Sequence, residues 1–154
     1  MSKLKRLISI FCITVSVALC CAITAFATES SVYGDVPAPY YSNEITLTVP
    51  ALNGSISTST LAEGGFVFKG SDDKKCTFKT ITNATASGAD ARLLNSNGKS
   101  RSAWARNLLS DTTRTATTNA SKGYLYYAQI SSDLATFNSF DITFCFSPDD
   151  MTSR

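Results

Sequence analysis

This 154-residue chain contains no histidine, so carboxylates are its main candidates for catalysis. Its aromatic rings could bind a ligand, and its thiols could form a disulfide. Without histidine, Ser-His-Asp and Cys-His nucleophilic catalysis are excluded, as is every metal site that needs imidazole. Two carboxylates can hydrolyse a glycoside when they face each other. The adjacent pairs Asp72-Asp73 and Asp149-Asp150 do not fit, because neighbours on extended backbone point to opposite sides. We therefore expect no catalytic residues and no enzymatic activity.

The sequence also predicts no cofactor and no metal site. Oxygen ligands in the run Gly70-Ser71-Asp72-Asp73 could attract calcium, but the run lacks the fixed ligand spacing of an EF-hand. A nucleophilic role for Cys76 would need a neighbouring base, and none is evident. Solvated turn residues are the simpler interpretation of the acidic pairs.

Aromatic side chains offer the more informative pattern. Trp104 is the only tryptophan, and three tyrosines lie close together in the segment 124–130. On a strand, Tyr124 and Tyr126 would share one face while Tyr127 takes the other, so at least one group must be packed. An exposed aromatic face beside arginines could bind a sugar or a peptide. The candidate binding residues are Trp104, Tyr124, Tyr126, Arg101 and Arg106.

The alternative for these residues is structural. Trp104 would then be fully buried, and the tyrosine hydroxyls would be hydrogen-bonded to backbone. Arg101 and Arg106 belong to a modest basic concentration between residues 99 and 114, which a solvated face also explains. We favour the structural role for Trp104 and keep Tyr124 and Tyr126 as the better functional candidates.

The first 27 residues have the pattern of a signal peptide. A basic start is followed by an apolar run from Leu7 to Ile23, and Ala25-Phe26-Ala27 is a small-x-small cleavage site. We expect cleavage before Thr28 and a secreted, extracellular protein without a stable membrane anchor. The alternatives are a retained membrane anchor and lipidation at Cys21, which lacks a small residue before it.

The expected mature chain has almost no net charge and two cysteines. From Thr28 onward, 11 Lys and Arg stand against 12 Asp and Glu, which gives no reason to propose nucleic acid or an anionic membrane as partner. Cys76 and Cys145 are the cysteines left after processing, and we predict a disulfide between them. Two buried free thiols are the alternative. The pattern places Cys145 on the polar face of its strand, whereas Cys76 shares a face with Phe78.

The segments that must position these residues are short and β-prone. Residues 28–43 form an extended leader, and residues 44–154 form a single domain. Alternation over 140–146 predicts a half-buried strand, and Asn97-Gly98 predicts a hairpin whose second arm is 100–107. Seven to nine short strands with frequent turns indicate an all-β antiparallel β-sandwich or jelly roll. The other expected strands are 45–49, 66–68, 76–82, 89–94 and 124–130, with the threonine-rich 112–118 as an edge strand or loop.

One part of the chain resembles a known family. The stretch Gly98 to Arg106, which contains Arg101, Trp104 and Ala105, precedes Thr115 and then Gly123-Tyr124-Leu125-Tyr126-Tyr127-Ala128. Residues 98–128 thereby resemble the closing half of lactococcin-972-type bacteriocins, which are small exported β-sandwich peptides acting on the Gram-positive envelope. The rest of the chain is similar to small exported β proteins of Gram-positive bacteria without an assigned activity.

Three functions follow from these patterns. The first is a secreted, non-enzymatic β-sandwich that binds an extracellular or cell-surface ligand, which could be a carbohydrate, a protein or an envelope component. The second, implied by the resemblance, is a bacteriocin-like antibacterial protein. The third is a carboxylate-dependent hydrolase, which would need two carboxylates about 5–10 Å apart in a cleft.

Overall fold

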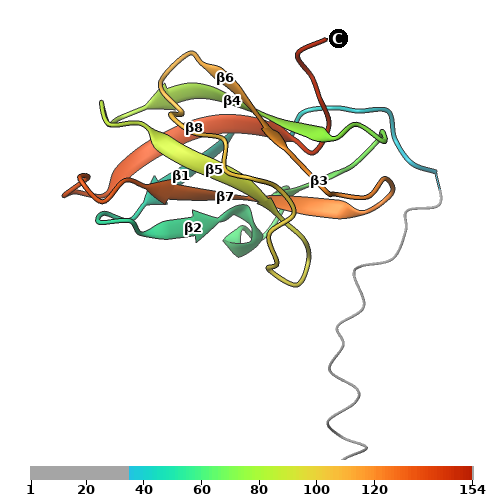
Figure 1. Ribbon diagram of the computed structural model, residues 1–154. Helices are drawn as coiled ribbons and strands as arrows, with labels where there is room; N and C mark the ends of the chain where they lie inside the picture. The colour runs from blue at the N-terminus through green and yellow to red at the C-terminus, as the bar shows by residue number, and fades with distance from the viewer. Residues whose placement is uncertain (1–34, 154) are drawn as a thin grey trace, which may run out of the picture.

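The computed structural model describes residues 35–153, which form two antiparallel sheets stacked face to face (Figure 1). The first sheet has the order β1-β8-β4-β6, and the second has the order β2-β7-β3 with β5 on the other edge of β7. The predicted signal peptide and its cleavage site lie outside the described residues. The elements are β1 (Ile45–Val49), β2 (Ser55–Ser57), a 3-10 turn (Thr58–Thr60), β3 (Phe66–Phe68), β4 (Lys75–Asn83), β5 (Ala89–Leu94), β6 (Thr113–Thr117), β7 (Leu125–Ser132) and β8 (Phe140–Ser147).

The core lies between the two sheets and is supplied by alternate residues of each strand. β8 shows the pattern most clearly, with Phe144 and Phe146 fully buried while Asp141 faces outward. The ring of Phe78 stacks on that of Phe146 at 6.4 Å between centroids. Each fully buried phenylalanine contributes about 1.5–3 kcal/mol of transfer free energy. The all-β sandwich expected from the sequence is confirmed.

The described part of the predicted leader, residues 35–43, contains no helix or strand. Ser42 ties this segment to the sandwich: its backbone N–H donates to the Phe146 carbonyl at 2.8 Å, and its hydroxyl accepts from the Phe146 N–H at 3.0 Å. Among residues 35–153, no helix is long and apolar enough to cross a bilayer.

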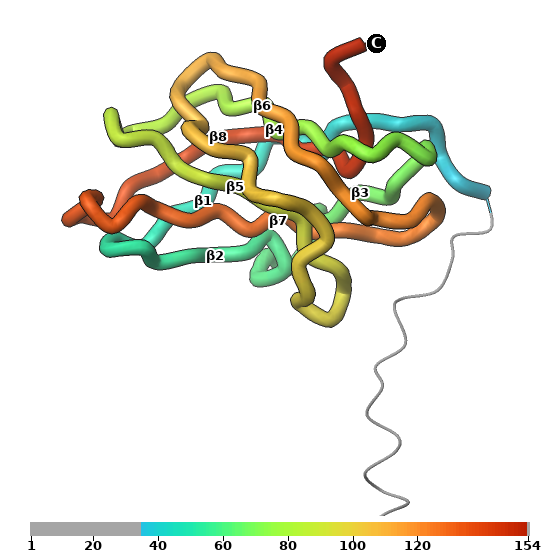
Figure 2. The backbone as a smooth tube through the Cα atoms, in the orientation of Figure 1, coloured from blue at the N-terminus to red at the C-terminus, as the bar shows by residue number. Residues whose placement is uncertain are grey.

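The expected strand over 100–107 is wrong in detail. After the turn at residues 95–98 the chain does run back beside β5 (Figure 2), but it makes only isolated bridges, such as Ala91 with Ala105. The ladder is interrupted because the Ser102 hydroxyl, rather than a backbone carbonyl, accepts from the Leu93 N–H at 2.9 Å. The same segment then bridges to Thr118 beyond the end of β6, so it connects the two sheets. The threonine-rich segment itself forms the edge strand β6, as expected.

Candidate functional site

The candidate site lies on the outer face of the second sheet. Strand geometry places alternate residues on opposite faces, and the buried residues of β7 include Tyr126 and Ala128. Gln129 and Ser131 therefore face outward. The register sets Gln129 opposite Arg92 of β5, and Ser131 opposite Asp90. On the other edge of β7 these two residues meet Ser57 and Ser55 of β2.

The segment after β5 adds the tryptophan to this face. Ala91 and Ala105 exchange two backbone hydrogen bonds, at 2.9 and 2.7 Å. Because both alanines point into the core, the neighbours of Ala105 point outward. This single bridge places Trp104 level with Arg92.

A chain of side-chain contacts then runs across the sheet from Trp104. The guanidinium carbon of Arg92 lies 4.4 Å from the centroid of the Trp104 ring, which is cation–π geometry. The Arg92 Nε–H donates to Oε1 of Gln129 at 2.7 Å. Gln129 in turn donates from Nε2 to the Ser55 hydroxyl at 3.0 Å. The ring, the guanidinium and the amide are thus held in a defined arrangement by neighbouring strands.

A second row of polar groups runs beside the first. Arg106 makes an ion pair with Asp90, and the Asn107 backbone N–H donates to the other carboxylate oxygen at 3.2 Å. The Arg106 side chain is 69% exposed, so the pair contributes at most about 1 kcal/mol to stability. Its value to a binding site is to offer fixed donors and acceptors close to the Trp104 ring.

These rows enclose a pocket of about 310 Å³, which we call the Trp104 pocket. It combines one aromatic ring with hydroxyl, amide, carboxylate and guanidinium groups, which can form directional hydrogen bonds to a small polar ligand. The lining residues are Asn53, Ser55, Asp90, Arg92, Trp104, Arg106, Gln129 and Ser131.

An aromatic strip, defined as Phe66, Phe68 and Tyr127, continues the same face. Phe66 pairs with Tyr127 in the register of β3 and β7, so the two side chains lie on one side of the sheet. Their rings meet edge to face at 6.3 Å, and Phe66 contacts Phe68 in the same way at 5.8 Å. Phe66 is 41% exposed. Because Tyr127 is two residues from Gln129, the strip extends the face along β7 from the Trp104 pocket.

A second, larger pocket of about 440 Å³ contains another of the predicted residues. It is lined by Arg101 and by polar or small residues of 100–103 and 117–119. No aromatic ring lines it, and Arg101 is its single charged group. The structure therefore separates Arg101 from Trp104 and Arg106, which it brings together in the Trp104 pocket.

The prediction that Tyr126 binds a ligand is wrong. Tyr126 is 1% exposed, and its hydroxyl accepts from the Ser121 N–H at 2.8 Å and donates to the Ser121 carbonyl at 3.2 Å. Tyr124, on the same side of the chain, is half-buried and packs against the core cluster. Trp104, which we expected to be core, is half-exposed in the pocket. Tyr126 is therefore a core residue, whereas Tyr124 and Trp104 are both partly exposed.

The sequence interpretation missed Arg92, Asp90, Gln129 and Tyr127. Alternation along β7 could have found the last two, because they fall on the face opposite Tyr126. No local signal links Arg92 to Trp104. Their contact depends on the bridge between Ala91 and Ala105, which only the folded chain shows.

The predicted disulfide between Cys76 and Cys145 is absent, and both thiols are free. Cys76 belongs to the core, where its thiol donates to the Ala116 carbonyl at 3.4 Å. Cys145 lies opposite Lys79 on the outer face of the same sheet. The two side chains point away from each other across the sheet, so no bridge can form in this fold. The sequence pattern had already placed them on different faces.

Burial controls the chemistry of both thiols. Desolvation raises the pKa of Cys76 to about 11, partly offset by hydrogen bonds to its side chain. Desolvation also raises the pKa of Cys145, and the nearby Glu44 carboxylate adds to that effect. Neither thiol is therefore activated as a nucleophile at neutral pH.

The carboxylates that the sequence offers in adjacent pairs are separated by the fold. Asp149 is fully buried beside Lys69, whereas Asp150 lies in the C-terminal segment beside the exposed Lys75. Asp73 lies near Asp149 through Ser71. In residues 35–153 no group of three or more cysteine, aspartate or glutamate side chains could hold a metal ion.

Comparisons with protein-family models, with curated proteins and with solved structures found no match to this chain. The resemblance of residues 98–128 to lactococcin-972-type bacteriocins stays a prediction. The geometry of the Trp104 pocket therefore carries the inference about function.

Proposed function

We propose that this chain is an exported, non-enzymatic binding protein whose ligand is an extracellular or cell-surface carbohydrate held in the Trp104 pocket. The observation that carries the proposal is the fixed arrangement of Trp104, Arg92 and Gln129. The half-exposed ring supplies a surface for the C–H face of a sugar, and the planar guanidinium and amide supply hydrogen bonds to its hydroxyls.

The composition of the pocket favours a sugar over other ligands. Trp104 is its single large apolar residue, so an apolar peptide would find little surface to bury. Asp90 forms an ion pair with Arg106 and Arg92 is bonded to Gln129, so neither guanidinium is held free for a phosphate group. Hydroxyl, amide and carboxylate groups match the many donors and acceptors of a carbohydrate.

The aromatic strip fits a ligand longer than one sugar ring. Tyr127 and Phe66 lie on the same face as the Trp104 pocket, and a chain of sugars lying along β7 would contact both regions. Each additional ring would add apolar contact area at little cost in ligand entropy, because linked sugars are already restrained.

The experiment is a co-sedimentation assay with insoluble polysaccharides. The chain from Thr28 onward is mixed with peptidoglycan sacculi from a Gram-positive bacterium, with chitin and with cellulose. We expect the protein to sediment with one of them and the variant Trp104→Ala to bind at least about tenfold more weakly, a loss of about 1.4 kcal/mol. Thr115→Ala, on the outer face of the other sheet, is the matched control and should bind normally.

Two outcomes would contradict the proposal. One is sedimentation with none of the polysaccharides, and the other is equal binding by the wild type and Trp104→Ala. Arrest of Gram-positive indicator cells by the purified protein would instead favour the antibacterial action that the resemblance implies.

A further inference from the structure

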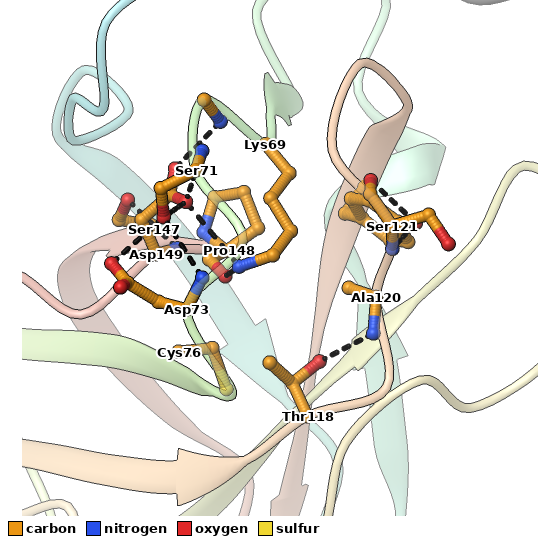
Figure 3. A network of polar contacts seen from close by, with 12 residues as sticks. Lys69, Ser71, Asp73, Cys76, Thr118, Ala120, Ser121, Ser147, Pro148 and Asp149 are labelled. Carbon is orange, nitrogen blue, oxygen red and sulfur yellow. Dashed lines mark hydrogen bonds and ion pairs between the residues drawn. The ribbon is translucent and has the colours of Figure 1, made fainter.

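A fully buried ion pair lies at the ends of β3 and β8 and takes no part in the Trp104 pocket. Lys69 follows β3 and Asp149 follows β8, and the side chains of both are completely inaccessible to solvent (Figure 3). The Lys69 Nζ lies 3.3 Å from Oδ1 of Asp149 and 2.7 Å from the Pro148 carbonyl oxygen. Alternation along β3 places Val67 and Lys69 on the core side, which explains why the lysine points inward.

The burial of this pair has a structural cause. Gly70 lies directly beneath the extended leader, so closely that a Cβ atom there would come within 2.6 Å of the Pro39 nitrogen. The leader therefore packs against the residue that follows Lys69, and the side chains of the pair are completely inaccessible to solvent. Lysine is almost never fully buried, because removing an ammonium and a carboxylate from water costs several kcal/mol per ion. An apolar pair of similar size would avoid this cost.

The carboxylate of Asp149 is held by three donors besides the lysine. The Gly70 N–H donates to Oδ2 at 2.8 Å, and the Ser71 N–H donates to Oδ1 at 2.9 Å. The Ser71 hydroxyl also contacts Oδ1. Each oxygen thus accepts from a backbone N–H, and Oδ1 in addition faces the lysine and the Ser71 hydroxyl.

The Ser71 hydroxyl connects Asp149 to a second carboxylate. Its oxygen lies 2.7 Å from Oδ2 of Asp73 as well as in contact with Oδ1 of Asp149. A hydroxyl has one proton and cannot donate to two carboxylates at once. The hydroxyl therefore donates to one carboxylate at a time and can switch between them. Ser71 therefore provides a path for a proton between Asp73 and Oδ1 of Asp149.

We propose that Lys69 and Asp149 condense to an intramolecular amide, which makes this corner of the sandwich a covalent cross-link. The Nζ lone pair attacks Cγ of Asp149, the new C–N bond forms, and the C–Oδ1 bond breaks. Of the three protons of the Lys69 ammonium, one stays on the amide nitrogen and two leave with Oδ1 as water. The step needs no oxidant and no co-reactant.

Each neighbouring group has a role in that step. The Gly70 N–H lies where negative charge develops on Oδ2 during attack, and stabilises it as an oxyanion-hole donor does. Ser71 is the group that protonates the leaving Oδ1. Asp73 acts through Ser71 and is a positioning residue. Contact between the reacting groups replaces a bimolecular encounter, and exclusion of water favours condensation over hydrolysis.

The amide would give the fold a covalent cross-link, which the two free cysteines do not provide. Lys69 and Asp149 are 80 positions apart, so an amide between them closes a long loop and joins the end of β3 to the segment after β8. Closing a long loop restricts the unfolded chain, by the same argument that applies to a disulfide.

Mass spectrometry of the purified chain tests the proposal directly. The intact mass should be lower than that calculated from the sequence by one water molecule, under reducing conditions. Proteolysis should release a branched peptide in which the Lys69 side chain is bonded to the residue-149 side chain, identified by fragmentation. An intact mass equal to the calculated one overturns the proposal. So does a loss of water that fragmentation assigns to another position.

Three variants sharpen the result. Asp149→Asn should still form the amide but lose ammonia instead of water. Lys69→Met should show the full calculated mass. Lys75→Ala is the matched control and should keep the loss of water, because Lys75 contacts Asp150 at 3.7 Å on the exposed side of the chain. Loss of the mass difference in Lys75→Ala would contradict the assignment to Lys69.

The role of Asp73 has its own readout. Asp73→Asn should leave a fraction of molecules unlinked, with the fraction falling over hours and depending on pH, while Asp73→Glu restores complete linkage. Thermal unfolding of the same samples shows whether the variant is folded. Complete linkage in a folded Asp73→Asn would remove Asp73 from the mechanism.

Discussion

The outer faces of the two sheets differ in the hydrogen bonds that their side chains make. On the first sheet, short side chains satisfy one another: the Thr46 and Thr143 hydroxyls lie 2.9 Å apart, and Thr48 donates to Asp141 at 2.6 Å. On the second sheet, the equivalent positions hold an aromatic ring, a guanidinium and an amide that enclose a pocket. The first sheet also has a pocket of about 310 Å³, lined by Glu44, Lys79, Cys145 and their neighbours, but no aromatic ring lines it. What distinguishes the two is the size and chemistry of the outward residues rather than the backbone.

The largest expected effect is a loss of stability when Tyr126, on the inward side of β7, is replaced. Tyr126→Ala should lower the free energy of unfolding by about 3–5 kcal/mol, because it removes a fully buried ring and leaves a cavity. Tyr126→Phe should cost about 1 kcal/mol, which is the usual net value of a hydrogen bond. Denaturant unfolding measures both. A change below about 1 kcal/mol in Tyr126→Ala would contradict the core assignment.

The next effect is a dependence of stability on pH, caused by the buried Cys76 thiol of the first sheet. The folded pKa of Cys76 is about 11 against 9.0 for an ordinary thiol, so the folded state keeps a proton that the unfolded chain loses. The protonated Cys76 thiol therefore contributes about 2–3 kcal/mol to the free energy of unfolding. This contribution is complete below pH 9 and is lost as the pH rises through 11. Stability should therefore fall more steeply from pH 9 to 11 in the wild type than in Cys76→Ala. Parallel slopes would contradict this.

Thiol labelling tests whether Cys76 and Cys145 are free. Thiol labelling of the unfolded, unreduced chain from Thr28 onward should modify two cysteines, and labelling of the folded chain should reach Cys145 before the fully buried Cys76. A finding of no free thiol after unfolding would restore the disulfide and require a different arrangement of β4 and β8.

A smaller effect is expected at the Trp104 pocket. Arg92→Ala should weaken carbohydrate binding about five- to tenfold, or about 1–1.4 kcal/mol, by removing the group that contacts both Trp104 and Gln129. Lys79→Ala, which removes a cation from the outer face of the first sheet, is the control and should bind as the wild type does. Equal loss in both variants would indicate a general effect of charge rather than a site.

The smallest effect is expected on the outer face of the first sheet. Thr48→Ala removes an exposed hydrogen bond to Asp141 and should change stability by no more than about 0.5 kcal/mol, with no effect on binding. Thermal unfolding and the co-sedimentation assay measure the two quantities. A loss of binding in this variant would show that the first sheet also contributes to recognition.

Local pattern predicted the strands well, because alternation requires only neighbouring residues. The segments 45–49, 66–68 and 89–94 were expected with the bounds that the structure shows. Which side of a strand faces the core is harder to predict from sequence, as Tyr126 and Tyr127 show. Alternation places them on opposite faces, but the choice between them depends on the opposing sheet and on the Ser121 backbone, which satisfies the Tyr126 hydroxyl.

The candidate site was only partly predictable for a related reason. Trp104 and Arg106 were chosen as residue types that bind ligands, and both line the pocket. Arg92 lies twelve positions before Trp104, and its contact with the ring follows from one pair of backbone hydrogen bonds between Ala91 and Ala105. Such a contact depends on the register of a segment that is not a regular strand. Hydrophobic periodicity carries no information about it.

The fluorescence of Trp104 reports directly on ligand binding in the proposed site, because Trp104 is the only tryptophan in the chain and lines the pocket. Soluble fragments of the polysaccharide that sediments the protein are titrated into the chain from Thr28 onward, and the emission is recorded at each concentration. If the ligand binds in the Trp104 pocket, the emission should change saturably in intensity or wavelength, with the same dissociation constant as a calorimetric titration. Calorimetric binding without any change in Trp104 emission would contradict binding in the Trp104 pocket, because the ligand would then be held elsewhere on the molecule.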